Sequence, residues 1–298
     1  MSEAVPAPLP REAIDRFLGE IRPKLHRYCA RMTGSVIDGE DVVQETLVKA
    51  MAALPRVETV VHLERWLFRV AHNAALDFLR RRARQEARLA DDDPAMLIDT
   101  QEAADRAQIA AASLHTFMRL PVAQRSAVIL KDVLGYSMHE IGGFLETSLP
   151  AVKAALHRGR ARLRELAQEP DDTPPPVLDG AEQALLAAYV ERFNARDFDA
   201  VRDMLADEAR LDLVNRHRLD GRREVGKYFA NYGKIEDWHL AVGLVDGRPA
   251  VLVFDRDEPE GRPIYFVLLG WAGGKIALIR DFRYARYVTD GAEIRVLS

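Results

Sequence analysis

The sequence predicts a multidomain protein in which two all-α domains are followed by an α+β domain. Apolar residues recur three or four positions apart over residues 11–89, and again from about residue 102 to residue 168, as on one face of a helix. Three consecutive prolines at residues 174–176 then interrupt the chain. Beyond them, segments rich in Val, Ile, Leu and aromatic residues alternate with turn signals, which is typical of strands.

Length and composition narrow the class of protein. The chain has 298 residues, 48% hydrophobic and 30% charged, which suits two or three globular domains and excludes a collagenous or wholly disordered chain. Its single cysteine, Cys29, cannot form an internal disulfide and has no Cys or His cluster nearby, so we expect neither a metal nor a cofactor. No signal peptide or membrane-spanning run is recognisable, and we expect a cytoplasmic protein without membrane contact.

Basic residues are concentrated in two stretches of an otherwise acidic chain, whose net charge is −4. Residues 61–90 hold seven arginines against three acidic residues, and residues 150–166 hold five Lys or Arg against one. Two separate basic stretches indicate two contacts with a polyanion such as DNA.

The breaks in these patterns predict the domain boundaries. An acidic segment, DDDP, ends the first helical region at residues 91–94, and the proline-rich segment ends the second. The expected parts are a helical bundle at 1–90, a linker at 91–111, a helix-turn-helix at 112–168, a proline-rich linker at 169–180 and an α+β domain at 181–298.

The helix-turn-helix is predicted within residues 137–166. A short helix from Met138 to Leu145 precedes a turn, and Ser148 can cap the second helix. That helix has an apolar face and a basic face, formed respectively by Val152, Leu156, Gly159, Leu163 and by Lys153, His157, Arg160, Arg164. Such a helix suits the major groove of DNA, although an ordinary helical hairpin with a solvated basic face is the alternative.

Two segments around this motif, LPVAQRSAVILKDVLGYSMHEI and AVKAALHRGRARLRE, resemble domain 4 of extracytoplasmic-function sigma factors of the sigma-70 family. The resemblance implies that promoter −35 DNA contacts Ser148, Lys153, His157, Arg158, Arg160 and Arg162, the last two on the backbone. Two features depart from the family pattern. Gly142 and Gly143 replace helix formers, at about 1 kcal/mol each in a helix interior, and Glu146 stands where a turn glycine is common. The −35 sequence preference therefore stays open.

Residues 38–54, DGEDVVQETLVKAMAAL, resemble the helix with which the family binds core RNA polymerase. The resemblance implies that Asp41, Gln44 and Glu45 contact a coiled coil of the largest polymerase subunit. The apolar positions that can pack inward are Val42, Val43, Leu47 and Met51. By its residues alone, this flank could equally be a solvated helix face.

Residues 66–84, WLFRVAHNAALDFLRRRAR, resemble the family's −10 recognition helix. Holding an unpaired strand requires cations for its phosphates and a stacking surface or pocket for a base, for which the loop at 54–65 is a candidate. We expect Trp66 to pack in the core rather than stack on a base, and an inward stripe of Leu67, Val70, Ala74 and Phe78. The residues implied in −10 DNA binding are Arg65, Arg69, Asn73, Arg80 and Arg81.

Residues 181–298 resemble the SnoaL-like branch of the nuclear transport factor-like cone fold. Strand alternation suggests five polar residues as liners of a ligand cavity: Asp212, His217, His239, Tyr265 and Asp281. Such a domain can contact the sigma domains, bind a small ligand or act as an enzyme, and intramolecular modulation of the sigma domains is the expected role.

The expected function is that of a sigma factor that binds core RNA polymerase and promoter DNA and has no enzymatic chemistry. A helix-turn-helix regulator acting without polymerase is one alternative, and a cone-fold enzyme fused to a DNA-binding module is another.

Overall fold

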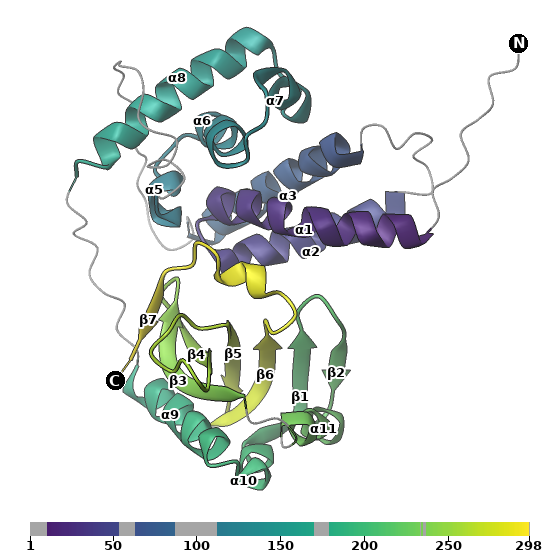
Figure 1. Ribbon diagram of the computed structural model, residues 1–298, viewed down its shortest axis with the longest axis vertical. Helices are drawn as coiled ribbons and strands as arrows, with labels where there is room; N and C mark the ends of the chain where they lie inside the picture. Colours follow the sequence, from purple (N-terminus) through teal and green to yellow (C-terminus); the bar gives the residue numbers. More distant parts are fainter. Residues whose placement is uncertain are drawn as a thin grey trace, which may run out of the picture. The chain divides into compact units, whose positions relative to one another are not determined.

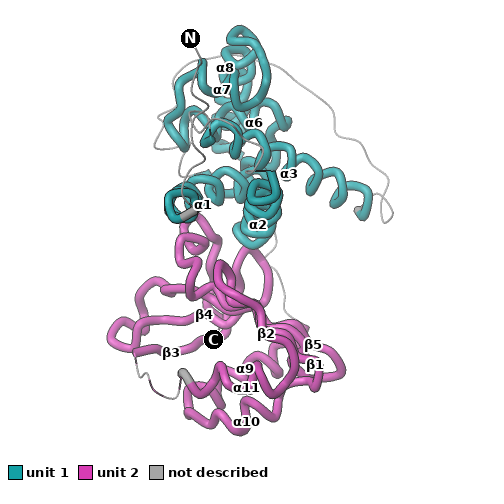
Figure 2. The backbone as a smooth tube through the Cα atoms, turned by 90° about the vertical axis from the view of Figure 1, so that its right-hand side faces the viewer, with its two compact units in different colours: residues 1–171 teal, residues 172–298 magenta. Residues whose placement is uncertain are grey.

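The computed structural model describes residues 11–53, 63–86, 112–169, 179–232, 234 and 237–297. The chain divides into two compact units, residues 1–171 and 172–298, which Figure 2 colours separately. The predicted interdomain linker, most of the proline-rich linker and most of the loop proposed as a base pocket lie outside the described residues.

The described part of the first unit is all-α, as predicted (Figure 1). The N-terminal helical domain contains α1 (Arg11–Thr33), α2 (Val36–Ala53) and α3 (Leu63–Glu86). The helix-turn-helix domain contains α5 (Leu114–Met118), α6 (Val122–Val128), η3 (Ile129–Val133), α7 (Met138–Phe144) and α8 (Leu149–Leu166).

The segment η3 is a π-helix, a feature that hydrophobic periodicity did not predict. The Leu134 backbone N–H donates to the carbonyl of Ile129 at 3.0 Å, five residues back instead of four. Gly135 follows with a φ of +81°, in the left-handed region that side chains disfavour. The wide turn and the glycine together end this helix and redirect the chain toward α7.

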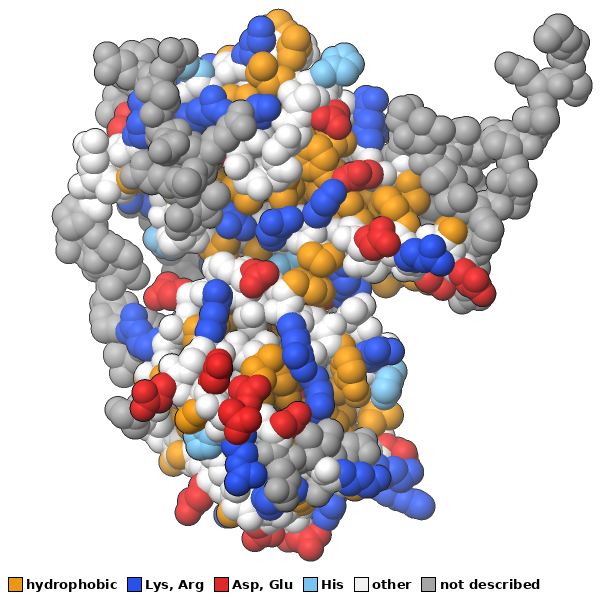
Figure 3. All heavy atoms as spheres, viewed as in Figure 1, with side chains coloured by type: hydrophobic (Ala, Val, Ile, Leu, Met, Phe, Trp, Pro, Cys, Tyr) orange, Lys and Arg blue, Asp and Glu red, His pale blue; other side chains and the backbone are white. Residues whose placement is uncertain are grey.

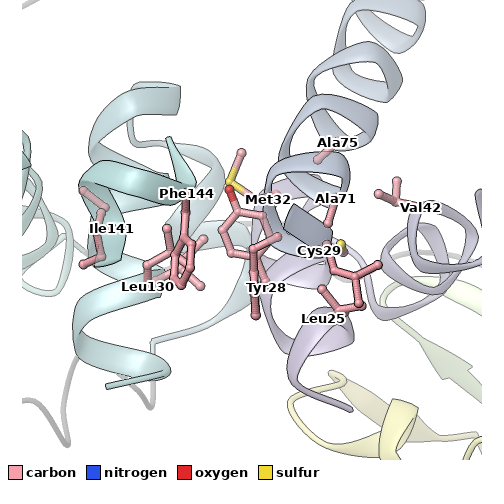
Figure 4. Packing of buried hydrophobic residues seen from close by; sticks show 14 of the residues in the cluster. Leu25, Tyr28, Cys29, Met32, Val42, Ala71, Ala75, Leu130, Ile141 and Phe144 are labelled. Atoms are coloured by element: carbon pink, nitrogen blue, oxygen red, sulfur yellow. The ribbon is translucent and has the colours of Figure 1, made fainter. Parts of the chain in front are cut away.

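One hydrophobic cluster runs through both domains of the first unit. Figure 4 shows Tyr28 and Met32 of α1 beside Leu130 of η3 and Phe144 of α7. All four side chains are at most 4% exposed. The two helical domains therefore share a core and form one compact unit.

The second unit is an α+β domain, as predicted. Its helical segments are α9 (Gly180–Asn194), α10 (Phe198–Asp203), α11 (Arg222–Tyr232) and the 3-10 helix η4 (Arg286–Thr289). Its strands are β1 (Leu205–Leu213), β2 (Arg218–Asp220), β3 (Trp238–Val245), β4 (Arg248–Asp255), β5 (Tyr265–Ala272), β6 (Lys275–Asp281) and β7 (Ile294–Val296).

The strands form one sheet in the order β2-β1-β6-β5-β4-β3-β7. Strands β3 to β6 form a meander, in which each strand pairs antiparallel with the next. Strand β1 pairs with β6 in parallel, which the sequence did not indicate. Helices α9 and α11 pack on this sheet.

The C-terminal domain has its own hydrophobic cluster, which shares no residue with that of the first unit. Aromatic rings of α9 and α11, such as Phe193 and Phe229, fill it together with alternate residues of the strands. Successive residues of a strand point to opposite faces of the sheet. A strand residue that lies between two members of this cluster therefore points to the face opposite the cluster.

Candidate nucleic-acid interface

Two serine caps build the helix-turn-helix. Ser137 forms a capping box with Glu140 at the start of α7, and Ser148 caps α8 by accepting a hydrogen bond from the backbone N–H of Ala151. In the turn between the helices, Glu146 has a φ of 50°. The predicted helix starts are therefore confirmed, and a non-glycine residue occupies the left-handed turn position.

Helix α8 presents the predicted apolar face. Of the predicted basic face, Lys153 and His157 are exposed, whereas Arg160 and Arg164 are half-buried. Val152, Leu156 and Leu163 are buried. Gly159 is buried where an added Cβ would lie 2.7 Å from a methyl group of Val128 in α6, so this glycine permits close packing of the two helices.

Four of the six residues predicted to contact −35 DNA are exposed along α8: Ser148, Lys153, His157 and Arg158. The N-terminal half of such a helix is the part that reaches base edges in the major groove. The arrangement can supply a lysine, an imidazole and a guanidinium to one groove.

The other two predicted DNA contacts have partners within the domain. Arg160 donates from Nε to Oδ2 of Asp132 at 2.9 Å and makes a second hydrogen bond from Nη2 to Oδ1. The hydrogen bond with Asp132 raises the pKa of Arg160. Arg162 donates to Glu165 at 2.8 Å on the surface of the same helix. Arg160 therefore has a packing role that the sequence did not reveal, because its partner lies 28 residues away in η3.

Helix α3 carries the residues predicted to bind the −10 strand. Arg65, Asn73, Arg80 and Arg81 are exposed, whereas Arg69 is half-buried and pairs with Glu146 of the helix-turn-helix domain at 2.8 Å. The predicted inward stripe is confirmed for Leu67 and Ala74, which are buried, and for Phe78, which packs on the core. Its fourth member, Val70, is half-buried and does not belong to the core cluster. Trp66 also packs against the core, as expected.

His72 of α3 is half-buried. Its Nδ1 lies 2.7 Å from the hydroxyl of Tyr28 in α1, and burial lowers its pKa. The sequence around His72 contains no pattern that distinguishes a buried histidine from an exposed one.

The flank predicted to bind polymerase lies on α2, where Asp41, Gln44 and Glu45 are half-buried. Glu45 accepts from Arg81 of α3 at 3.0 Å and pairs with Lys49 at 2.7 Å. Burial alone would raise the pKa of Glu45, but these two cations hold it below its ordinary value. The structure thus joins one residue of the predicted polymerase flank to one of the predicted −10 set.

The same helix has an exposed apolar surface. Val48 is 67% exposed and Met51 is 53% exposed, so the expectation that Met51 packs inward is wrong. Met51 lies in the last turn of α2, where its neighbour Ala50 is the residue buried in the core. Apolar side chains beside an acidic flank are a surface that a protein partner can cover.

In the C-terminal domain, Tyr265 and Asp281 do lie together. Tyr228 and Tyr232 of α11 both donate to Oδ2 of Asp281, and the Tyr232 hydroxyl lies 3.1 Å from that of Tyr265. The backbone N–H of Arg283 donates to Oδ1 at 2.8 Å. Burial raises the pKa of Asp281, against the opposing effect of these hydrogen bonds.

The prediction that Asp212, His217 and His239 line the same cavity is wrong. Asp212 lies between two core residues of β1 and therefore faces the opposite side of the sheet, where it pairs with Arg218 and Arg280. By the same alternation His239 of β3 points away from the core and is exposed. His217 is exposed in the turn before β2.

The surface of the C-terminal domain carries mixed charge. Figure 3 shows its basic and acidic side chains interspersed on the face turned to the viewer. Among the described residues, no cluster of three or more metal-ligating groups occurs, and no helix is long and apolar enough to cross a membrane.

Three family models match the chain in order: Sigma-70 region 2 over residues 17–85, Sigma-70, region 4 over 114–163, and SnoaL-like domain over 186–279. The SigM sigma factor of Mycobacterium tuberculosis (strain ATCC 25618 / H37Rv) is 33% identical over 159 residues, which cover 52% of this chain and 78% of SigM. The chain belongs to the extracytoplasmic-function RNA polymerase sigma factors.

Other sigma factors match over different extents. SigG of Mycobacterium tuberculosis (strain ATCC 25618 / H37Rv) is 29% identical over 213 residues, which cover 63% of this chain but only 58% of SigG. The crystal structure of Mycobacterium tuberculosis SigJ matches 90% of this chain and 95% of its own length, at 20% identity and a TM-score of 0.35. RpoE of Bartonella quintana, crystallised with the anti-sigma factor NepR, matches 53% of this chain and 98% of its own at 24% identity and a TM-score of 0.42.

Proposed function

We propose that this sigma factor binds core RNA polymerase and directs it to promoters that it recognises at two elements. The observation that carries the proposal is the pairing of two basic helices in one unit. Helix α8 exposes Lys153, His157 and Arg158 in a helix-turn-helix, and α3 exposes Arg65 and Arg80 in a different domain. A regulator that acts without polymerase needs the first helix but has no use for the second.

Helix α8 is proposed to enter the major groove at the −35 element. Lys153 lies in the second turn, from which it can reach acceptors on a guanine edge, while His157 and Arg158 lie one turn further along, near the backbone. Ser148 at the cap can contact a phosphate together with the helix N-terminus. Arg162 can turn from Glu165 to the backbone, whereas Arg160 is better suited to positioning the helix.

Helix α3 is proposed to hold the unpaired −10 strand. Its arginines supply charge to the phosphates, and Asn73 supplies an amide that can pair with a base edge. The polymerase is proposed to contact Asp41, Gln44 and Glu45, with Val48 and Met51 covered in the same interface. Transcription initiation by this route takes place in the cytoplasm and requires no cofactor.

For the C-terminal domain we propose modulation of the sigma domains, through intramolecular contact or through a small ligand, and no enzymatic activity. The inward-facing carboxylate, Asp281, is engaged by two tyrosines and a backbone N–H. That arrangement is suited to holding α11 on the sheet and leaves the carboxylate poorly placed as a general base.

In vitro transcription with core polymerase tests the proposal. The full chain is compared with a truncation after Gln168, which retains the whole hydrophobic cluster of the first unit. Promoter-specific transcripts from the full chain are expected, and a change in their yield on truncation would give the sign of the C-terminal effect. The absence of specific transcripts from both proteins would refute the sigma function, and turnover that survived deletion of residues 1–168 would favour the enzyme.

A further inference from the structure

The turn before α8 and the first residues of that helix form an exposed tip of the helix-turn-helix domain. From Glu146 to Ala151 every residue is exposed, whereas the later turns of α8 pack on the domain through Val152, Leu156 and Leu163. Figure 1 shows this end of α8 at the turn that follows α7. The tip is therefore the part of the helix that a DNA groove can surround.

One residue of this tip has a large aliphatic side chain. Leu149, Val152 and Leu156 are three and four residues apart, which is the spacing of one helix face. Val152 and Leu156 are 1% and 4% exposed, but Leu149 is 41% exposed. Leu149 does not belong to the hydrophobic cluster of the first unit or to the partly buried residues packed against it. Packing within the domain therefore does not account for a leucine at this position.

Leu149 lies on the same side of α8 as Lys153, the residue proposed to contact a guanine edge at the −35 element. The two residues are four positions apart, so their side chains lie one turn apart, with an axial separation of about 6 Å. Successive base pairs of DNA are about 3.4 Å apart. A base that Leu149 contacts is therefore expected within about two base pairs of the base that Lys153 contacts.

The group in the major groove that suits an aliphatic side chain is the C5-methyl of thymine. The base edges otherwise present hydrogen-bond donors and acceptors, with which leucine cannot pair. Contact between two apolar groups removes both from water, and the burial of one methyl group corresponds to about a three- to fivefold change in affinity. Pro150 lies next to Leu149 in the first turn, where its ring restricts the backbone of both residues and reduces the entropy that binding costs.

We propose that Leu149 contacts the C5-methyl group of a thymine in the −35 element and thereby contributes to the sequence preference of this sigma factor. The proposal rests on the proposed −35 role of α8. It adds one apolar base contact to the polar contacts of Lys153, His157 and Arg158, and it requires a thymine close to the base that Lys153 contacts.

The test begins with holoenzyme assembled from core polymerase and the full chain, which selects duplexes from a random DNA library. Each thymine of the selected −35 element, on either strand, is then replaced singly by deoxyuridine, which lacks only the C5-methyl group. The affinity of the holoenzyme for each duplex is measured by filter binding. At one thymine, deoxyuridine is expected to lower the affinity about three- to fivefold.

Substitutions at Leu149 should change that discrimination. Leu149→Ala is expected to bind the thymine and deoxyuridine duplexes with equal affinity at that position, and Leu149→Met, which keeps an apolar side chain of similar size, should retain the preference for thymine. Leu149→Gln should select adenine there in a second library experiment, because a glutamine amide pairs with the adenine edge. Because Leu149 is exposed, these variants should unfold at the urea concentration of the parent.

The matched control is Val296→Ala, which shortens another exposed aliphatic side chain, in the C-terminal domain. It should keep the thymine preference of the parent. Lys153→Ala separates this inference from the −35 role of α8. It should weaken binding to the selected element and still discriminate thymine from deoxyuridine.

Equal discrimination in the parent and in Leu149→Ala would overturn the proposal, and so would a parent holoenzyme that binds every deoxyuridine duplex as tightly as the thymine duplex. Loss of core polymerase binding in Leu149→Ala would also overturn it, because the side chain would then belong to a protein contact. If Lys153→Ala weakens binding to the element while Leu149→Ala changes nothing, the thymine contact fails and the −35 role stands. If neither substitution changes binding to the element, the −35 role of α8 fails.

Discussion

Arg160 on the recognition helix α8 is held by two hydrogen bonds to the carboxylate of Asp132, whose side chain is fully buried in the π-helix η3. This pair ties α8 to the element that carries the chain toward α7. The two hydrogen bonds occupy Nε and Nη2 of Arg160.

We therefore expect Arg160→Ala to destabilise the first unit by about 2–3 kcal/mol, because the buried carboxylate loses its guanidinium partner. Urea unfolding followed by circular dichroism measures the change. Arg158→Ala, on the exposed face of the same helix, is the control and should change stability by less than about 0.5 kcal/mol. An equal loss of unfolding free energy in the two variants would show that the Arg160–Asp132 pair does not stabilise the first unit.

Lys153→Ala combined with Arg158→Ala should weaken −35-dependent initiation while leaving core polymerase binding intact. Both side chains are exposed on α8, and the losses expected are those of one base contact and one phosphate contact, about 1–3 kcal/mol for the first. Transcription from promoters with and without a −35 element, beside a core-binding assay, provides the measurement. Parallel loss of core binding would contradict this division of labour between the domains.

His72 should make the stability of the first unit dependent on pH. Burial lowers its pKa in the folded state below the ordinary value of about 6.5, so the unfolded chain binds a proton more readily. The stability contributed by neutral His72 is present above pH 6.5 or so and is lost as the pH falls through the folded pKa. Urea midpoints measured between neutral and mildly acidic pH should decline.

His72→Gln is the matched variant for that pH series, since glutamine keeps an acceptor for the Tyr28 hydroxyl but does not titrate. The difference between the two proteins isolates the histidine from other titrating groups. An identical decline in both proteins would assign the pH dependence elsewhere.

Tyr232→Phe should destabilise the C-terminal domain by about 1–2 kcal/mol, because it removes one donor to the buried Asp281 and one neighbour of the Tyr265 hydroxyl. Thermal unfolding of the full chain, followed by tryptophan fluorescence, detects the loss, since Trp238 packs on the Tyr232 ring. The control is Tyr284→Phe, which removes the hydroxyl of an exposed tyrosine and should leave the unfolding temperature unchanged. An unchanged unfolding temperature in Tyr232→Phe would mean that the hydrogen bonds of Tyr232 to Asp281 and Tyr265 add no stability.

The sequence by itself determined the features that depend on neighbours along the chain. Helical periodicity predicted α8 and its two faces, the serine at position 148 predicted its cap, and the proline-rich segment predicted the division into units. These patterns reflect local backbone propensity and amphipathic burial, which act within a few residues.

Only the tertiary structure decided which charged side chains form ion pairs within the protein. Arg160 and Asp132 are 28 positions apart, and Arg69 meets Glu146 across two domains. Strand alternation within each segment did not separate the faces of Asp212 and Asp281, because the sequence did not indicate the parallel register of β1 and β6. In that register Asp212 lies opposite Arg280, and Asp281 lies opposite Leu213. An ion pair depends on how distant elements pack. The sequence pattern of a basic helix face is therefore the same whether its arginines are exposed or are paired with acidic residues of another element.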